Sequence, residues 1–265
     1  MSGVAANSGL LARALLALVS LLCLAREGSA ETLVTALSEP TVKITSNFTG
    51  AEIVVFGTVE RDATTVERPD AYDIVVTVSG PTETVVTRRK DRVFGVWVNN
   101  EAVRFMDIPS FYALHSTRRL NEIADEKVLR DRGIGAANLE MRAEAGVNDS
   151  AERIATFRDA LLRLKLQEGL YAQRSSAVGF LSPSLFRTNI PLPANVPHGN
   201  YKVTVSLFRG GALLTSEQQK LRIAKAGFEQ FTYSMAHTNA LVYGLATVLM
   251  ALGTGWLAGV MFRKE

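Results

Sequence analysis

The side chains that most often carry chemistry in proteins are few in this 265-residue chain and widely spaced. Its three histidines, His115, His198 and His237, form no H-x-x-x-H or H-E-x-x-H pair, so a zinc site built from histidine is not expected. The only cysteine, Cys23, lies in the N-terminal apolar segment, and no G-x-S-x-G nucleophile motif occurs. The sequence therefore predicts no catalytic residue, no cofactor and no metal site.

Polar residues near the middle of the chain leave an alternative open. Arg104, Asp107, His115 and Arg118 could meet in the fold, around a junction between a sheet and a helical segment. Such a set would form a site for a small ligand or for a reaction, assembled from dispersed residues rather than from one motif.

A basic run directly precedes an apolar run in R88RKDRVFGVWVNNEAVRF105. Because side chains alternate along a strand, the residues from 93 to 99 would present two largely apolar faces, which predicts a central strand with Trp97 in the core. The preceding cations are expected in a solvated turn at the start of that strand. Contact with a partner or with anionic lipid is the alternative. The cations are Arg88, Arg89, Lys90 and Arg92.

Short segments with alternating apolar residues recur between Thr32 and Thr87, and again at 201–208 and 218–224. Turn-forming residues separate them, including a hairpin turn at Arg209-Gly210-Gly211. Strands of this length and spacing predict a mainly β fold, an immunoglobulin-like β-sandwich with antiparallel strands.

The middle of the chain has helical rather than strand periodicity. L120NEIADEKVLRDRG133 and S150AERIATFRDALLRLKLQEGLYAQ173 each predict one helix, and Ser150 is a suitable N-cap for the second. We therefore expect a helical insertion in the sandwich at about 118–174.

The two ends of the chain predict export and membrane anchoring. An apolar core, L15LALVSLLCLA25, followed by small residues up to Ala30 indicates a signal peptide over 1–30, with an uncleaved anchor as the alternative. The stretch A240LVYGLATVLMALGTGWLAGVMF262 has no charge and predicts a transmembrane helix, and Arg263-Lys264 after it place the C-terminus in the cytoplasm.

These signals divide the chain into four parts. After the signal peptide, 1–30, we expect a periplasmic domain over 31–228, a juxtamembrane segment and transmembrane helix over 229–262, and a cytoplasmic tail over 263–265. Residues 31–237 carry 25 Lys and Arg against 24 Asp and Glu, a difference of +1. Since a nucleic-acid-binding domain needs a net basic surface, no nucleic-acid partner is expected.

Small residues recur every fourth position along the predicted span. Such a ridge lets a second membrane helix approach closely, in a homodimer or with a permease partner. The raised glycine content of membrane helices in general is the alternative explanation. The ridge consists of Thr247, Ala251, Gly255 and Gly259.

The chain resembles the family of "putative transmembrane proteins" of alphaproteobacteria over essentially its whole mature length. The residues that carry the likeness are S46NFTGAEIVVFG57, R88RKDRVFGVWVNN100, F105MDIPSFYALHST117 and the terminal span. The resemblance implies this topology and a bacterial inner-membrane location, and it carries over no catalytic residue. It also implies gene neighbourhoods with sulfite-exporter-type permeases, and hence a transport-linked partner.

Two classes of function follow. The first is a non-enzymatic, membrane-anchored periplasmic module, an accessory or adaptor to an inner-membrane transport or envelope complex. The second is a periplasmic small-ligand-binding protein or enzyme that uses the dispersed polar residues. The absence of a recognisable catalytic motif favours the first.

Overall fold

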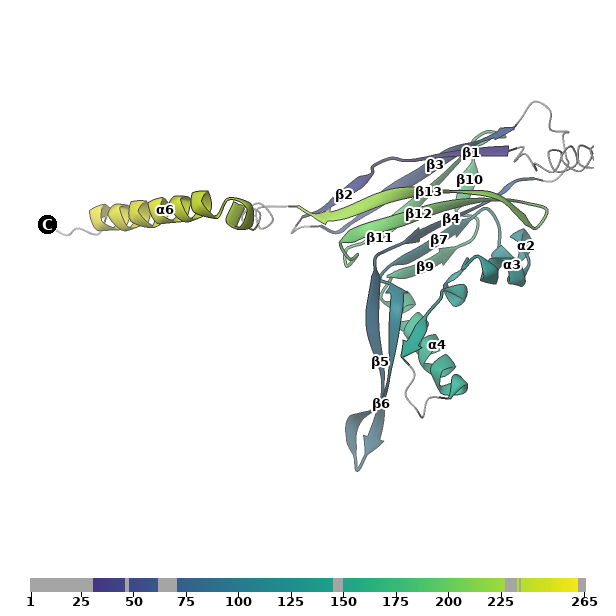
Figure 1. Ribbon diagram of the computed structural model, residues 1–265, viewed down its shortest axis with the longest axis horizontal. Coiled ribbons are helices and arrows are strands. Elements are labelled where there is room, and N and C mark those ends of the chain that lie inside the picture. The colour runs from purple at the N-terminus through teal and green to yellow at the C-terminus, as the bar shows by residue number, and fades with distance from the viewer. Residues whose placement is uncertain are drawn as a thin grey trace, which may run out of the picture.

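The computed structural model describes residues 31–45, 48–61, 71–144, 150–226, 233 and 235–261. The predicted signal peptide, residues 1–30, and Arg263-Lys264 lie outside these residues. The prediction of a mainly β fold with a few helices and a C-terminal apolar helix is confirmed (Figure 1).

Thirteen strands in the described residues form three sheets. The first sheet has the order β1 (Glu31–Leu37), β3 (Gly50–Arg61), β11 (Leu185–Pro193) and β10 (Val178–Phe180). The second sheet has the order β2 (Thr41–Ile44), β13 (Ala212–Lys225), β12 (Gly199–Arg209), β4 (Asp73–Ser79), β7 (Tyr112–Ser116) and β9 (Tyr171–Arg174). The third sheet has the order β5 (Thr82–Val93), β6 (Val96–Pro109) and β8 (Arg142–Glu144).

The first two sheets face each other, and their inward residues form the core. Ile53 and Val55 of β3 and Val203 and Val205 of β12 are almost fully buried, and the outward residues between them are polar or partly exposed. This period of two is what a strand with one buried face requires. Side chains also join the sheets directly: Gln219 Nε2 donates to the Thr35 carbonyl oxygen at 3.2 Å.

Gly57 lies where strand β3 packs closely against β1 and against the Phe186 ring. A Cβ atom at this position would lie 2.4 Å from the Val34 carbonyl oxygen and 2.7 Å from the Phe186 ring. No other residue fits between the backbone of β1 and that ring, so glycine is required here for close approach.

Two edge pairs are parallel, although the sequence pattern predicted antiparallel strands. β2 pairs with β13 and β9 pairs with β7 in parallel. β2 reaches the second sheet because the chain crosses from the first at 38–40, where the Arg222 amide donates to the Pro40 carbonyl oxygen at 2.9 Å. β9 is parallel to β7 because a long insertion separates the two strands and brings the chain back to the same end.

That insertion contains α2 (Leu120–Ile123), α3 (Glu126–Asp131), a 3₁₀ turn η1 (Ala136–Asn138), β8 and α4 (Ala151–Gln167). It covers the outer face of the second sheet at β7, where the Gly135 amide donates to the Tyr112 hydroxyl at 3.0 Å. The outer face at β12 and β13 is left open.

The predicted helix over 120–133 is wrong in its continuity. Ala124 and Asp125 have extended backbone angles and separate α2 from α3. Ile123 and Ala124 are buried, and Asp125 is the N-cap of α3. Burial of this corner outweighs the helical propensity of the segment.

The second predicted helix begins as expected but ends earlier. Ser150 caps α4, since its hydroxyl accepts from the Arg153 amide at 3.2 Å. α4 ends at Gln167, because Gly169 adopts a left-handed conformation with φ of 71°. Glycine at this position after a helix is a frequent stop. The residues from Tyr171 onward form β9 instead of a last helical turn.

The strands β5 and β6 form a long hairpin that projects from the body (Figure 1). They pair from Thr82 with Pro109 to Val93 with Val96, so the turn consists of Phe94 and Gly95 alone. The short strand β8 pairs only with 104–106 of β6. The remaining outer half of the hairpin is a two-stranded ribbon.

Candidate functional site

The base of the hairpin is held against the body by α4. Lys165 Nζ lies 2.5 Å from Glu83 Oε1, and Arg153 Nε lies 3.4 Å from Glu101 Oε2. Lys165 is buried, although lysine seldom is, because this carboxylate compensates its charge. Phe105 of β6 is fully buried in the same region. These contacts therefore fix the base of the hairpin against the body.

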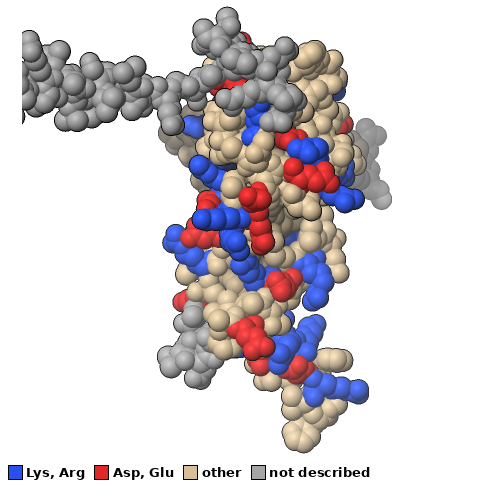
Figure 2. Space-filling model, turned by 90° about the vertical axis from the view of Figure 1, so that its right-hand side faces the viewer, with Lys and Arg blue, Asp and Glu red and all other residues tan. Residues whose placement is uncertain are grey.

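The outer end of the hairpin exposes a group of apolar side chains. Phe94 is fully exposed, Trp97 is 67% exposed and Val96 is 63% exposed, and Val93 and Val98 beside them are also exposed. Figure 2 shows this uncharged end at the bottom of the molecule, below a group of basic side chains with acidic ones among them. Large apolar side chains gathered on a projecting element indicate an interaction surface. We call Val93, Phe94, Val96, Trp97 and Val98 the hairpin tip.

The prediction that Trp97 lies in the core is therefore wrong. The strand is apolar on both faces, as the sequence showed, but no sheet or helix in the described body covers either face of it. A two-sided apolar strand is compatible with burial in the protein's own core or with burial against something outside it. The sequence pattern did not distinguish these cases.

The four cations lie within a strand and not in a turn. Arg88, Arg89, Lys90 and Arg92 all belong to β5, where register shifts between Arg89 and Lys90. Arg89 pairs with Glu101 at 3.0 Å and with Asp91 at 3.5 Å. Arg92 Nε donates to the Gly95 carbonyl oxygen at 3.3 Å.

Three of these cations have no carboxylate partner within the described residues: Arg88, Lys90 and Arg92. Arg92 lies directly opposite Trp97 in the hairpin, and Lys90 lies opposite Asn99. Paired residues of a hairpin share one face, and residues two apart along a strand share it as well. Lys90, Arg92 and Trp97 therefore line the same face, which combines positive charge with an aromatic ring.

The apolar helix α6 (Ala240–Met261) has 22 residues, and none of them is buried. At 1.5 Å per residue it is about 33 Å long, enough to cross the hydrocarbon core of a bilayer. It is the single helix in the described part of the chain with the length and composition of a membrane span.

The predicted ridge lies on this helix and is open. A Cβ atom at Gly255 or Gly259 would meet nothing within 4 Å. Thr247 Oγ1 donates to the carbonyl oxygens of Tyr243, at 3.0 Å, and of Gly244, at 2.8 Å, so its hydroxyl is satisfied within the helix. Ala251 completes the ridge. Whether another helix packs on these four residues stays a prediction.

The four dispersed polar residues do not form a site. Arg104 pairs with Glu144 at 3.2 Å, and Asp107 pairs with Arg142 at 3.6 Å. Arg118 binds Asp73 through two nitrogen atoms. Each charged residue is thus engaged by its own partner, and no described contact joins two members of the set.

His115, the fourth residue of the set, is buried between the two main sheets. Its Nδ1 lies 2.8 Å from Thr188 Oγ1, and that hydroxyl donates to the Ala177 carbonyl oxygen at 2.8 Å. The hydroxyl proton is thus already used, so His115 Nδ1 must carry the proton and donate it. Nε2 is left as a buried acceptor without a partner in the described residues.

Protonation of His115 would place a second proton at this unpartnered Nε2. Burial penalises the charged ring, and the nearby Arg174 repels it, so the pKa of His115 falls to about 4. The imidazole is therefore neutral at pH 7. It joins the sheets through a hydrogen bond and is not placed to exchange protons with solvent.

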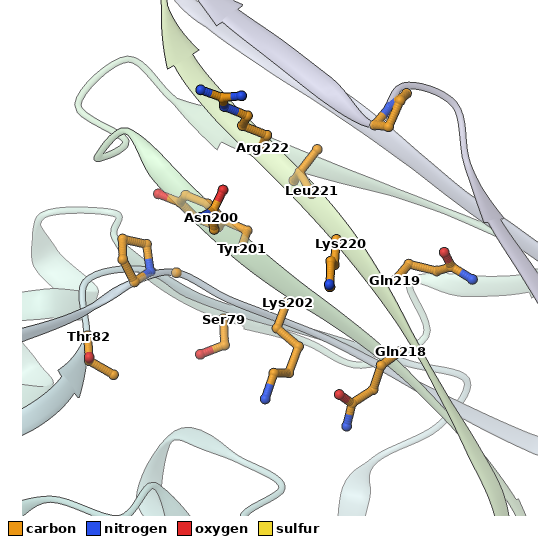
Figure 3. Close-up of a pocket in the computed structure, with 13 residues that line it drawn as sticks. Ser79, Thr82, Asn200, Tyr201, Lys202, Gln218, Gln219, Lys220, Leu221 and Arg222 are labelled. Carbon is orange, nitrogen blue, oxygen red and sulfur yellow. The ribbon is translucent and has the colours of Figure 1, made fainter.

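A shallow depression of about 670 Å³ lies on the open outer face of β12 and β13 (Figure 3). Lys202 and Lys220 pair directly across the two strands there, and Arg222 lies beside them. Like charges directly opposite each other repel, which gives this surface a preference for anions. Its charged groups are all exposed, so it contains no desolvated donor of the kind that selects one ligand.

The described residues contain no group of three or more His, Cys, Asp or Glu side chains that could hold a metal ion. The features that remain unexplained by the fold itself are the hairpin tip with its cations and the exposed apolar helix. Sequence reasoning identified the helix but missed Phe94 and Val96 as surface residues. The signal available for them was the pair Phe94-Gly95 between two long strand-like runs.

In the described residues, a β body is followed by one apolar helix that could span a membrane. This is the arrangement of a membrane-anchored protein. The chain matches the family described as "Putative transmembrane protein (Alph_Pro_TM)" over residues 32–264, and it belongs to that family. A search of curated proteins gave no match.

Proposed function

We propose that this protein is a non-enzymatic module of the bacterial inner membrane. In this proposal α6 crosses the membrane once, the β body lies in the periplasm, and the C-terminus lies in the cytoplasm. The body acts as an accessory or adaptor to a transport or envelope complex. The observation that carries the proposal is α6, an apolar helix of 22 residues of which none is buried.

The polar chemistry of the body supports this choice over an enzyme. The charged residues that could have formed a reactive site, Arg104, Asp107 and Arg118, are each bound to another charged group. His115 is held neutral and away from solvent. These groups stabilise the fold, whereas the exposed apolar surfaces are free to make contacts outside it.

In the adaptor proposal, α6 recognises a neighbouring membrane helix through its small-residue ridge. Lipid offers no hydrophobic drive for helix association, so close van der Waals contact must hold the pair together. Gly255 and Gly259 permit that contact because nothing projects from the helix at these two positions.

Replacing both Gly255 and Gly259 with leucine is expected to weaken association without preventing membrane insertion, because leucine is favourable in a span. The bulky side chains separate the helices and cost about 1–2 kcal/mol, or roughly a 5- to 30-fold loss of affinity. Co-purification of the full chain with its partner or with a tagged second copy measures the effect.

Ala246→Leu with Gly253→Leu is the matched control, since these residues face away from the ridge at 100° per residue. This variant should associate like the parent. Equal recovery of a partner with both double variants would show that the ridge is not a contact surface.

A further inference from the structure

We infer that the hairpin tip is a second membrane contact, which inserts into the headgroup layer of an anionic lipid bilayer. This inference rests on the proposed function in one respect: α6 must hold the body beside a bilayer. The surface itself is the end of β5 and β6, and its occupant is the lipid rather than another protein.

The shape of the tip suits insertion. Phe94 is fully exposed, and Val96 and Trp97 beside it are mostly exposed. Residues 93–98 carry no charge, and Val93 pairs with Val96 directly behind the two-residue turn. Tryptophan is the residue most typical of the membrane–water boundary, because its ring is apolar with one polar edge.

The backbone of the turn gives a second and independent argument. Phe94 has φ of 48° and Gly95 has φ of 86°, so both central residues are in the left-handed region. Two-residue turns of this kind strongly favour Asn-Gly or Asp-Gly, because a bulky side chain is costly at positive φ. An aromatic residue held there against this preference, and fully exposed among the described residues, indicates a role outside the fold.

The distance of the cations from Phe94 suits a contact with lipid headgroups. At about 3.3 Å per residue, Arg92 lies about 7 Å behind Phe94 and Lys90 about 13 Å behind it. Interfacial segments bury their apolar face about 5–10 Å into the boundary between headgroups and acyl chains. Phe94 would therefore enter the apolar edge, Arg92 and Trp97, opposite each other, would lie at its boundary with the phosphates, and Lys90 would lie further out.

Charge complementarity favours lipid over a second copy of the chain. Arg88, Lys90 and Arg92 lack carboxylate partners in the described residues, whereas Arg89 is neutralised by Glu101. A second hairpin would bring three more cations against these three. An anionic lipid surface instead attracts every one of them.

The chain has two tryptophans, Trp97 in the tip and Trp256 in α6, which allows a direct test. In a Trp256→Phe variant of the full chain, reconstituted in vesicles that contain phosphatidylglycerol, Trp97 is the sole tryptophan. Brominated lipids quench tryptophan only at close range. We expect brominated phosphatidylglycerol to quench Trp97 emission, with less quenching in vesicles of phosphatidylcholine alone.

Two variants in this background test the two parts of the surface. Phe94→Asp removes the insertion, and the turn should remain folded because aspartate tolerates positive φ. Replacement of Arg88, Lys90 and Arg92 with glutamine removes the charge attraction. Both are expected to lose most of the quenching, whereas Leu181→Asp, at a residue 66% exposed elsewhere on the body, should retain it.

Unquenched Trp97 in anionic vesicles would overturn the inference, and so would equal quenching in the Phe94→Asp variant. Trp97 emission that changes with protein density and is not quenched by brominated lipid would assign the tip to a second copy. Trp97 that is shielded only after a membrane partner is added would assign it to that partner. None of these outcomes depends on co-purification through the α6 ridge, so failure of the lipid contact and failure of the adaptor proposal are distinguishable.

Discussion

The Phe105→Ala variant is expected to lose about 3–5 kcal/mol of its free energy of unfolding, as other buried phenylalanines do when truncated. Phe105 is fully buried where the hairpin joins the body. Its ring is lost from a packed region that cannot collapse around the cavity, since strands enclose it. Urea unfolding of the full chain in detergent, followed by circular dichroism of the sheet, measures the change.

Trp97→Ala is the matched comparison, because Trp97 is an aromatic residue of the same strand. It is 67% exposed, so its truncation should change the free energy of unfolding by less than about 0.5 kcal/mol. A loss at Trp97 as large as at Phe105 would mean that the hairpin tip is covered by the body, and the tip would then be unavailable to any partner.

The Arg118→Ala variant is expected to cost about 1–3 kcal/mol, because it removes two hydrogen bonds from a buried carboxylate while Arg118 itself is 51% exposed. The Asp73 side chain is only 4% exposed, and it accepts from Arg118 Nε at 2.8 Å and from Arg118 Nη2 at 2.5 Å. After the substitution the Thr117 hydroxyl, at 2.8 Å, is the one side-chain partner that it keeps among the described residues. Thermal unfolding at pH 7 checks this result.

Arg104→Ala removes the same side chain from an exposed pair. Arg104 and Glu144 are each 56% exposed, so water replaces the lost contact and the cost should be about 1 kcal/mol or less. If Arg118→Ala is no more destabilising than Arg104→Ala, then Arg118 does not contribute to the stability of the fold through Asp73. A role for it in binding would then have to be reconsidered.

The outcome for the core strands shows what alternation along a sequence can predict. Val203 and Val205 alternate with polar residues, and they are buried on one face as expected. The turn at Arg209-Gly210-Gly211 is also where the sequence placed it, with positive φ at both glycines. One-sided patterns and glycine-rich turns are local signals, so they are readable without tertiary contacts.

The hairpin tip shows where local signals fail. Val93 and Val98 lie in a run that is apolar on both faces, and such a run predicts burial without naming what buries it. The same limit applies to α2 and α3, where packing of Ile123 and Ala124 interrupts a segment with good helical propensity. Both features depend on what surrounds the segment, and propensity does not contain that information.

The depression at Lys202 and Lys220 could not be predicted for a related reason. The two lysines belong to different strands. They lie opposite each other because of the register in which β12 pairs with β13. Register depends on the turn and on a shift between Leu207 and Phe208. A sequence pattern fixes neither the shift nor the pairing that follows it.

The central claim is that α6 anchors an exported β body whose C-terminus is cytoplasmic, and reporter fusions measure this most directly. A reporter that is active only in the periplasm is fused after Phe228, and one that is active only in the cytoplasm is fused after Glu265. The account predicts that both reporters are active at these positions and that each is inactive when the two positions are exchanged. Activity in the exchanged arrangement would contradict the account, because the hairpin tip would then lie on the cytoplasmic side.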